Sequence, residues 1–192
     1  MLTDRFADAL SCAQDWHRAQ TRKGSSTPYI AHLLSVSALV LEVGGTEDEA
    51  IAALLHDAIE DQGGSAVAET ILEKFGPTVL AIVRECSDWD GDGAKPTWRQ
   101  RKEGFVASIA EISASGRLVA AADKLHNARD LLEDYRVLGD DLWRRFNGGR
   151  AGTLWYYRAV ADALQQSAPP RRIVDELQRV VTELEEMTAT GQ

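Results

Sequence analysis

The sequence concentrates imidazole and carboxylate groups in the stretch HDAIED at residues 56–61, directly after the apolar run IAALL at residues 51–55. Buried acidic groups are unfavourable unless they are paired or bound to a cation, so this density requires a compensating charge. Side chains four residues apart share one helix face, which places His56 over Glu60 and Asp57 over Asp61, so all four side chains are expected to project into one arc. The pattern predicts a helix that ends in a metal site with hydrolytic groups beside it. A solvated helix end would explain neither the histidine nor the apolar residues before it.

Length and composition indicate a single globular domain. The chain has 192 residues, of which 44% are hydrophobic and 27% charged, so a full hydrophobic core is expected. The formal net charge of −9 argues against nucleic acid as the main partner, but it allows a small phosphorylated ligand held by local arginines and lysines. No segment has the length of a membrane span, and the N-terminus does not begin a signal peptide. We therefore expect a cytoplasmic protein without a membrane partner.

Helical periodicity runs through the sequence, and no segment alternates as a strand would, so we expect an all-α helical bundle. Thr46 and Glu49 have the spacing of a capping box, and Gly76-Pro77 predicts a corner between two helices. Loops are expected at residues 21–27 and 88–96. The expected helices run from Thr3 to about Gln20, from Tyr29 to Gly44, from Thr46 through residue 61, and over 65–75, 77–85, 97–109, 116–132 and 153–165, with a last amphipathic helix starting at Pro169-Pro170.

Two further metal ligands are expected far from His56 and Asp57. His32 lies early on a helix whose inner face is otherwise apolar, and Asp123 interrupts the run LVAAA at residues 118–122. The alternative for Asp123 is a buried ion pair with Lys124 or with an arginine. Ligation by histidines and carboxylates together favours manganese, with zinc and magnesium as alternatives.

The chain resembles the HD-domain metal-dependent phosphohydrolases, and within them the hydrolase domain of the RelA/SpoT alarmone family. The resemblance rests on the H…HD…D pattern and on four blocks in the family's order and spacing, over about the first two-thirds of the chain. They are HRAQTRK at 17–23, PYIAH at 28–32, ALLHDAIED at 53–61 and ADKLHNAR at 122–129. It implies one hydrolase domain over residues 1–192, with a motif core at about 17–130 and C-terminal helices at about 150–187. The long members also carry synthetase and regulatory domains, so the chain is more similar to stand-alone small alarmone hydrolases, such as the metazoan SpoT homologue.

The resemblance also implies an activity, namely metal-dependent hydrolysis of ppGpp or pppGpp to GDP or GTP and pyrophosphate. Glu60 and Asp61 would orient and deprotonate the water, as the family's catalytic Glu-Asp pair does. Arg22 and Lys23, in a glycine-containing loop before His32, are expected to bind the ligand. Asn127, four residues after Asp123, would hold the substrate or its ribose.

The chain departs from the family pattern at residues 88–96, DWDGDGAKP, where the long enzymes commonly have an acidic-acidic-Lys-Leu-Pro-Lys segment. The ligands of the distal phosphates are therefore open. Arg99, Arg101 and Lys102 would supply them, and an exposed helix face is the equal alternative. Tyr156, in the run WYY at 155–157, would form a wall of the nucleoside pocket, although such aromatic runs more often belong to a core.

Two other functions stay open. One is a different nucleotide phosphohydrolase, acting on ppApp, on a nucleoside monophosphate or on the 2′-phosphate of NADPH. The other is a non-catalytic HD module that binds a nucleotide and regulates a partner, which the presence of all four expected ligands and of Glu60 disfavours. The amphipathic final helix would serve either as core or as a self-association surface in a homo-oligomer.

Overall fold

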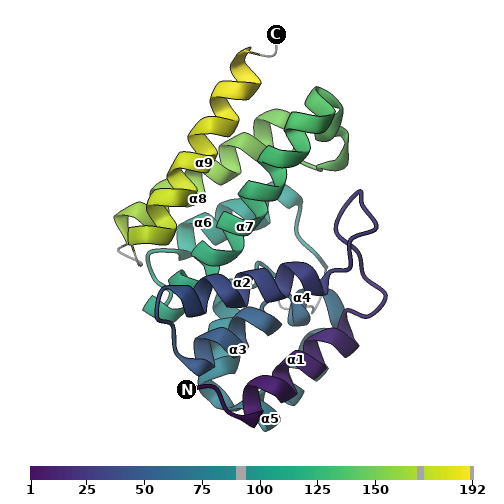
Figure 1. The fold of residues 1–192 in the computed structure, drawn as a ribbon, viewed down its shortest axis with the longest axis vertical. Coiled ribbons are helices and arrows are strands. Elements are labelled where there is room, and N and C mark those ends of the chain that lie inside the picture. The colour runs from purple at the N-terminus through teal and green to yellow at the C-terminus, as the bar shows by residue number, and fades with distance from the viewer. Residues whose placement is uncertain (90–93, 168–170, 191–192) are drawn as a thin grey trace.

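The computed structural model describes residues 1–89, 94–167 and 171–190, apart from the side chains of Arg171 and Thr190. Within these ranges the chain folds into helices without a strand, which confirms the predicted all-α class (Figure 1). Outside the helices, Thr21 and Pro28 form an isolated antiparallel bridge that closes the loop between them. The elements are α1 (Asp4–Trp16), α2 (Ile30–Glu42), α3 (Glu47–Leu55), α4 (Ala58–Gln62), α5 (Gly64–Cys86), α6 (Trp98–Ser108), α7 (Ala114–Leu138), the 3₁₀ segment η1 (Gly139–Arg145), α8 (Gly149–Gln166) and α9 (Arg171–Thr190).

Local sequence signals account for most helix ends. Thr46 and Glu49 form the predicted capping box, in which Glu49 Oε2 accepts from the Thr46 backbone N–H at 2.6 Å. Thr3 caps α1 as predicted, but α1 ends at Trp16 instead of about Gln20. The chain turns there because the Gln20 backbone N–H bonds to the His17 carbonyl oxygen at 2.9 Å. The bend at Gly76 is confirmed, since its φ of 88° interrupts α5 before Pro77.

The HDAIED stretch is less regular than predicted. The first helix ends at Leu55 and the next begins at Ala58, so His56 and Asp57 lie in the turn between α3 and α4. Their backbone angles stay close to helical, with φ and ψ of −60° and −30° for His56 and of −96° and −4° for Asp57. The turn thus presents the imidazole and the carboxylate from consecutive residues.

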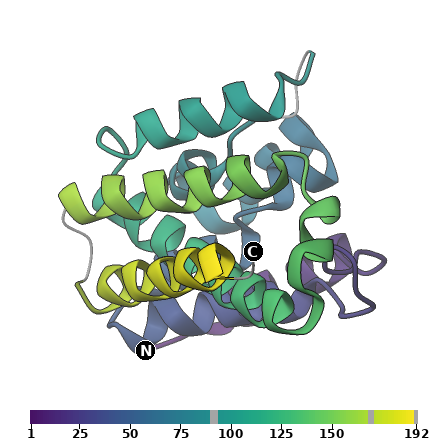
Figure 2. The same ribbon diagram turned by 90° about the horizontal axis from the view of Figure 1, so that it is seen from above.

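Helix α7 occupies the centre of the fold. It contacts α2, α3 and α5 in the part of the molecule that contains the N-terminus, and α8 and α9 in the part that contains the C-terminus (Figure 1). Seen from above (Figure 2), α6, α8 and α9 lie side by side in this order, and α8 contacts both α6 and α9. The segment η1, which the sequence did not predict, packs Leu142 and Trp143 against Leu131 and Leu132 of α7.

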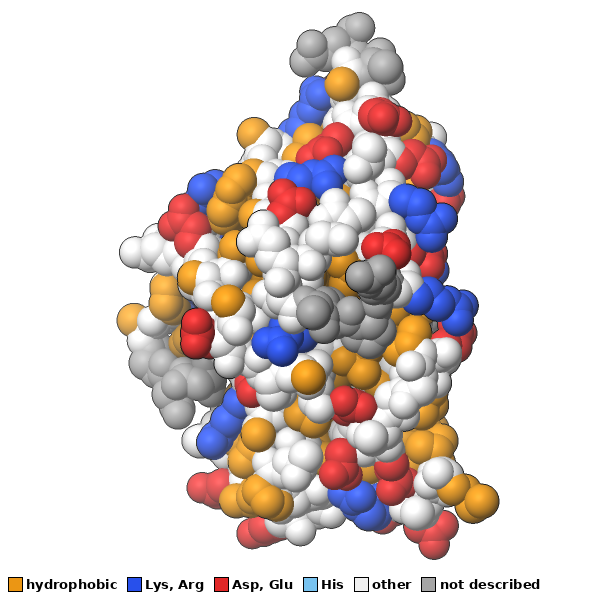
Figure 3. Space-filling model, turned by 90° about the vertical axis from the view of Figure 1, so that its left-hand side faces the viewer, with side chains coloured by type: hydrophobic (Ala, Val, Ile, Leu, Met, Phe, Trp, Pro, Cys, Tyr) orange, Lys and Arg blue, Asp and Glu red, His pale blue; other side chains and the backbone are white. Residues whose placement is uncertain are grey.

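The apolar side of α9 belongs to the core, which answers one question left open by its sequence. Its buried side chains pack in the clusters that α7 and α8 also line; they are Ile173, Val174, Leu177, Val181 and Leu184. On the face shown in Figure 3, acidic and basic side chains are interspersed with hydrophobic ones. In the described ranges no helix is both long enough and apolar enough to cross a bilayer. Residues 90–93, in the predicted loop at 88–96, and the Pro169-Pro170 pair lie outside the described residues.

Candidate metal centre and substrate cavity

His56 presents one ring nitrogen toward the carboxylates. Its side chain is buried, and its Nδ1 donates to the Ala53 carbonyl oxygen at 2.9 Å, which leaves Nε2 as the ligating atom. That Nε2 lies 3.0 Å from Asp57 Oδ2. Burial alone would lower the pKa of His56, but Asp57 and Asp123 outweigh it and raise the pKa well above the usual value. A proton and a metal ion compete for this nitrogen, and the carboxylates favour both.

Helices α2 and α7 bring the other two predicted ligands to the same point. His32 Nε2 lies 3.2 Å from Asp123 Oδ1 and 3.7 Å from Asp57 Oδ2, and His56 Nε2 lies 3.5 Å from Asp123 Oδ1. Both Nε2 atoms are buried, and neither makes a hydrogen bond of acceptable geometry. Buried polar atoms without a partner are uncommon in folded proteins. Two of them between two carboxylates indicate a site for a cation.

The residues fit a divalent metal ion. Ligand atoms of His32, His56 and Asp57 all lie within 4.8 Å of one another. Asp123 Oδ1 borders both histidines, whereas Asp123 Oδ2 accepts from the Lys124 ammonium group. Metal ligation and the ion pair with Lys124, which the sequence offered as alternatives, are therefore compatible, because they would use different oxygens of one carboxylate. Two imidazoles and two carboxylates form a donor set that suits a first-row divalent ion.

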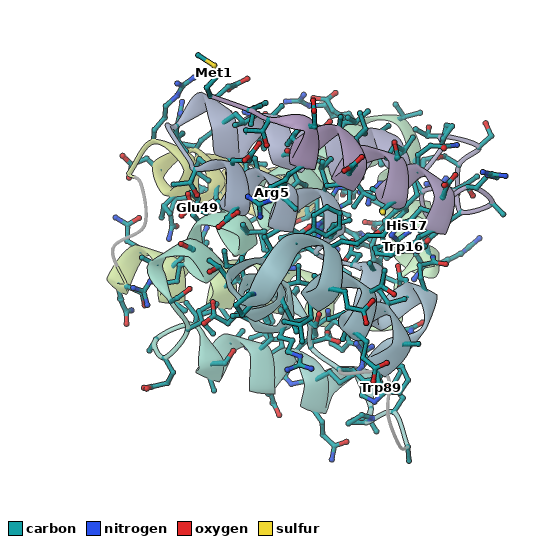
Figure 4. The ribbon with its side chains drawn as sticks, turned by 90° about the horizontal axis from the view of Figure 1, so that it is seen from below. Met1, Arg5, Trp16, His17, Glu49 and Trp89 are labelled. Carbon is teal, nitrogen blue, oxygen red and sulfur yellow. The ribbon has the colours of Figure 1, made fainter. Side chains whose placement is uncertain are left out.

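Neighbouring side chains hold the ligands in place. Tyr29 donates its hydroxyl hydrogen to Asp57 Oδ2 at 2.6 Å, and the Asn127 amide donates to Asp123 Oδ1. His17, at the end of α1 (Figure 4), stacks on the Tyr29 ring with the centroids 5.1 Å apart. Second-sphere contacts of this kind orient ligands and tune their basicity. The sequence did not single out Tyr29, although its position three residues before His32 is compatible with this role.

A cavity of about 730 Å³ opens beside the metal centre, within the range of small-molecule sites. Its wall contains cationic, amide and aromatic side chains from the loop before α2 and from α6, α7 and α8. Five residues that the sequence predicted as substrate contacts lie on this wall: Arg22, Lys23, Lys102, Asn127 and Tyr156. The structure thus brings these five together beside the expected ligands.

Arg22 is held rigidly at the boundary between cavity and metal centre. Its guanidinium donates to Asn127 Oδ1 at 2.6 Å and to Asp130 Oδ2 at 2.8 Å. Burial opposes its charge, but the interactions with Asp130, Tyr29 and Asp123 together outweigh burial and raise the pKa of Arg22. Lys23 is more loosely placed, with its ammonium group 5.3 Å from the centroid of the Phe146 ring.

Two of the predicted phosphate ligands lie outside this cavity. Arg99 stacks its guanidinium on Trp155 at 3.4 Å and bonds to Glu103 at 2.7 Å, as expected for the alternative of an exposed helix face. Arg101 donates to Glu60 Oε1 at 3.2 Å and to Asp88. In this structure Arg101 therefore contacts an expected catalytic residue instead of facing the nucleotide cavity.

Glu60 and Asp61 point to different surroundings. Glu60 lines a smaller inner cavity together with Asp57 and Asp123, and burial and then the Asp88 carboxylate raise its pKa. Asp61 is exposed and accepts from the Gln20 amide at 2.8 Å, and it lines neither cavity. The prediction that all four polar residues of HDAIED share one arc is therefore wrong. Consecutive helical residues point about 100° apart, so Glu60 and Asp61 diverge.

The sequence did not predict a role for Lys124 in substrate binding. It was considered only as a partner of Asp123, yet it lines both the outer and the inner cavity. Its ammonium group lies 5.0 Å from the Phe105 ring centroid and 5.9 Å from that of Tyr156. A lysine directly after an acidic residue in an otherwise apolar helix was the available signal.

Comparisons with known proteins agree with this geometry. The sequence profile described as HD domain matches residues 9–154. The protein named guanosine-3′,5′-bis(diphosphate) 3′-pyrophosphohydrolase MESH1 is 38% identical in Drosophila melanogaster and 35% identical in Homo sapiens, each over 130 residues, 66% of this chain and 69% of the relative. A solved structure described as a metazoan ortholog of SpoT that hydrolyzes ppGpp superimposes with a TM-score of 0.79 and 30% identity, over 95% of this chain and 97% of that one. The chain therefore belongs to the HD domain family.

Proposed function

We propose that the protein hydrolyses the 3′-diphosphate of ppGpp or pppGpp, with GDP or GTP and pyrophosphate as products. One observation carries the proposal: the four side chains that we propose as metal ligands border a cavity of about 730 Å³ lined by Arg22, Lys23, Lys102 and Lys124. These four cations outnumber the three carboxylates on the same wall, and such a local excess of positive charge in a chain of net charge −9 fits an anionic substrate. The relatives named as ppGpp 3′-pyrophosphohydrolases support the same substrate.

The chemistry requires one water molecule and balances without another reactant. The water oxygen bonds to the phosphorus next to the ribose 3′-oxygen, the bond between that phosphorus and the 3′-oxygen breaks, and the 3′-oxygen takes up a proton. A divalent ion, for which we propose Mn²⁺, would polarise the phosphoryl group and lower the pKa of the water. His32, His56, Asp57 and Asp123 would hold it.

The protein side chains then divide the remaining work. Glu60, at the inner cavity beside Asp57, would orient the water and accept its proton. Asn127, bonded to both Asp123 and Arg22, would link the metal ligand to the nucleotide-binding wall. Tyr156 would form the aromatic wall. We assign Asp61 a supporting role through its bond to Gln20.

A substrate panel tests the proposal directly. Protein loaded with Mn²⁺ would be offered ppGpp, pppGpp, ppApp, NADPH and nucleoside monophosphates, and the release of pyrophosphate and of phosphate would be measured. We expect pyrophosphate from the guanosine alarmones with the highest kcat/KM. Preferred release of phosphate from NADPH would indicate the other phosphohydrolase, and nucleotide binding without turnover the regulatory module.

Replacement of both Arg22 and Lys23 by alanine should weaken substrate binding while leaving the metal content unchanged. Charge-assisted contacts to phosphate contribute about 1.5–3 kcal/mol each, so we expect KM for ppGpp to rise tenfold or more. The effect should shrink for nucleotides with fewer phosphates. Arg144→Ala is the matched control, because Arg144 is exposed and pairs only with Asp141 among its described ionic contacts. An unchanged KM in the double variant would place the phosphate contacts elsewhere.

Further features of the protein are proposed on the same basis. We infer that residues 1–192 form one hydrolase domain and that the protein acts in the cytoplasm on a small nucleotide. Size-exclusion chromatography with light scattering would establish whether it forms a homo-oligomer.

A further inference from the structure

The inner cavity, of about 150 Å³, adjoins both the metal centre and the outer cavity. Asp57 and Asp123 lie on its wall, and Arg22, Lys102 and Lys124 are shared with the outer cavity. At about 30 Å³ per water, this volume holds roughly five water molecules. Sites for drug-sized molecules start at about 300 Å³, so the inner cavity fits a small polar group and not a nucleoside.

Two lysines converge on this cavity from different helices. The ammonium groups of Lys102 and Lys124 lie 4.9 Å and 5.9 Å from the centroid of the Tyr156 ring, and their side chains are only 20% and 12% exposed. Asp88 pairs with the first at 2.7 Å and Asp123 with the second. Burial lowers the pKa of Lys102, and the charge of Lys124 lowers it further. Two poorly hydrated cations that repel each other are stabilised when an anion binds between them.

The charge of the wall couples this cavity to the metal centre. Among the described residues that line it, three side chains are cationic and four are acidic. A divalent ion held by Asp57 and Asp123 would change the formal charge of the wall from −1 to +1. An anion would therefore bind here chiefly when the metal is present.

We propose that the inner cavity is a diphosphate-binding site, in which Lys124 and Lys102 donate directly to the oxygens of the anion. Only the identity of the bound anion rests on the proposed function: it would be the 3′-diphosphate of the substrate and, after hydrolysis, the released pyrophosphate. Asp123 supports this arrangement because Oδ1 faces the two histidines and Oδ2 faces Lys124. One carboxylate thus connects the metal ion to the cation that binds the phosphates.

Calorimetric titration of inorganic pyrophosphate into Mn²⁺-loaded protein tests the site without a nucleotide. Lys124→Met keeps the apolar stem between Phe105 and Tyr156, and the metal ion leaves Asp123 with a cationic partner. Lys102→Met leaves Asp88 bonded to Arg101. We expect each variant to bind pyrophosphate at least tenfold more weakly, as for loss of a charge-assisted contact. Lys74→Met is the matched control and should bind it like the parent, because the exposed Lys74 of α5 lines neither cavity.

Metal content and helical content of each variant complete the experiment. Unchanged pyrophosphate affinity in folded, metal-loaded Lys124→Met would overturn the assignment. Loss of metal from Lys124→Met, with parent-like binding in Lys102→Met, would also overturn it, because Lys124 would then only position Asp123. Inorganic phosphate in place of pyrophosphate should bind more weakly, and equal affinities would contradict a site for a diphosphate.

These measurements distinguish failure of the diphosphate-binding site from failure of the proposed function. Lysine-dependent binding of pyrophosphate by a protein that hydrolyses no guanosine alarmone would retain the site and reject the proposed function. Hydrolysis of a guanosine alarmone, with pyrophosphate affinity unchanged in both methionine variants, would retain the proposed function and reject the diphosphate-binding site.

Discussion

Replacement of His56 by alanine is expected to remove the metal ion and to reduce hydrolysis to background. The substitution deletes the buried Nε2 that faces both carboxylates and leaves Asp57 and Asp123 without this partner. Asp57→Ala should have the same effect, since it removes an oxygen close to both histidines. Metal stoichiometry of the purified proteins would be measured by mass spectrometry, together with the melting temperature with and without Mn²⁺.

The melting temperature gives a readout that does not depend on activity. A ligand at one hundred times its Kd stabilises the native state by about 2.7 kcal/mol, so the parent should melt at a higher temperature when Mn²⁺ is added. Neither alanine variant should respond. Asp61→Asn is the matched control, because this nearby exposed carboxylate bonds to Gln20 and should leave metal uptake unchanged. Full metal stoichiometry in either alanine variant would reject its ligand assignment.

The helices were predictable where their signals are local. The Thr46–Glu49 capping box and the bend at Gly76 depend on residues next to them in sequence, and both were identified. The segment η1 was missed because its stability is tertiary: Leu142 and Trp143, in a stretch of charged residues, pack on α7 and α9. A periodic pattern cannot develop over so few apolar residues.

The side chains that we propose as metal ligands could be identified for a different reason. His32 and Asp123 each interrupt an apolar helix face, so a specific compensating partner could be inferred for each of them. The sequence could not show which cationic side chains line the cavity. Arg99, Arg101 and Lys102 are neighbours on one helix, and only their tertiary contacts distinguish them. Stacking on Trp155 draws Arg99 away, whereas the contact with Tyr156 places Lys102 on the wall.

Substitution of Glu60 by glutamine should keep the metal but lower kcat roughly 10²–10⁴-fold, the usual contribution of a positioned acid or base. Glu60 Oε1 accepts from Lys95 at 3.0 Å and from Arg101 at 3.2 Å, and an amide oxygen can accept from both. The variant can therefore keep these hydrogen bonds, while it removes the negative charge of residue 60 and its ability to take up a proton. Rates would be measured under saturating ppGpp, with metal content determined in the same samples.

The pH dependence distinguishes proton transfer by Glu60 from a structural role. Burial and the Asp88 carboxylate raise the pKa of Glu60, and a base acts only when it is deprotonated. The rate of the parent should therefore fall on the acidic side with an apparent pKa above the usual glutamate value, and this limb should be absent from Glu60→Gln. Glu103→Gln, on an exposed residue paired with Arg99, should keep both rate and limb. A Glu60→Gln variant with the parent rate would show that another group activates the water, because neither the charge nor the basicity of residue 60 would then matter.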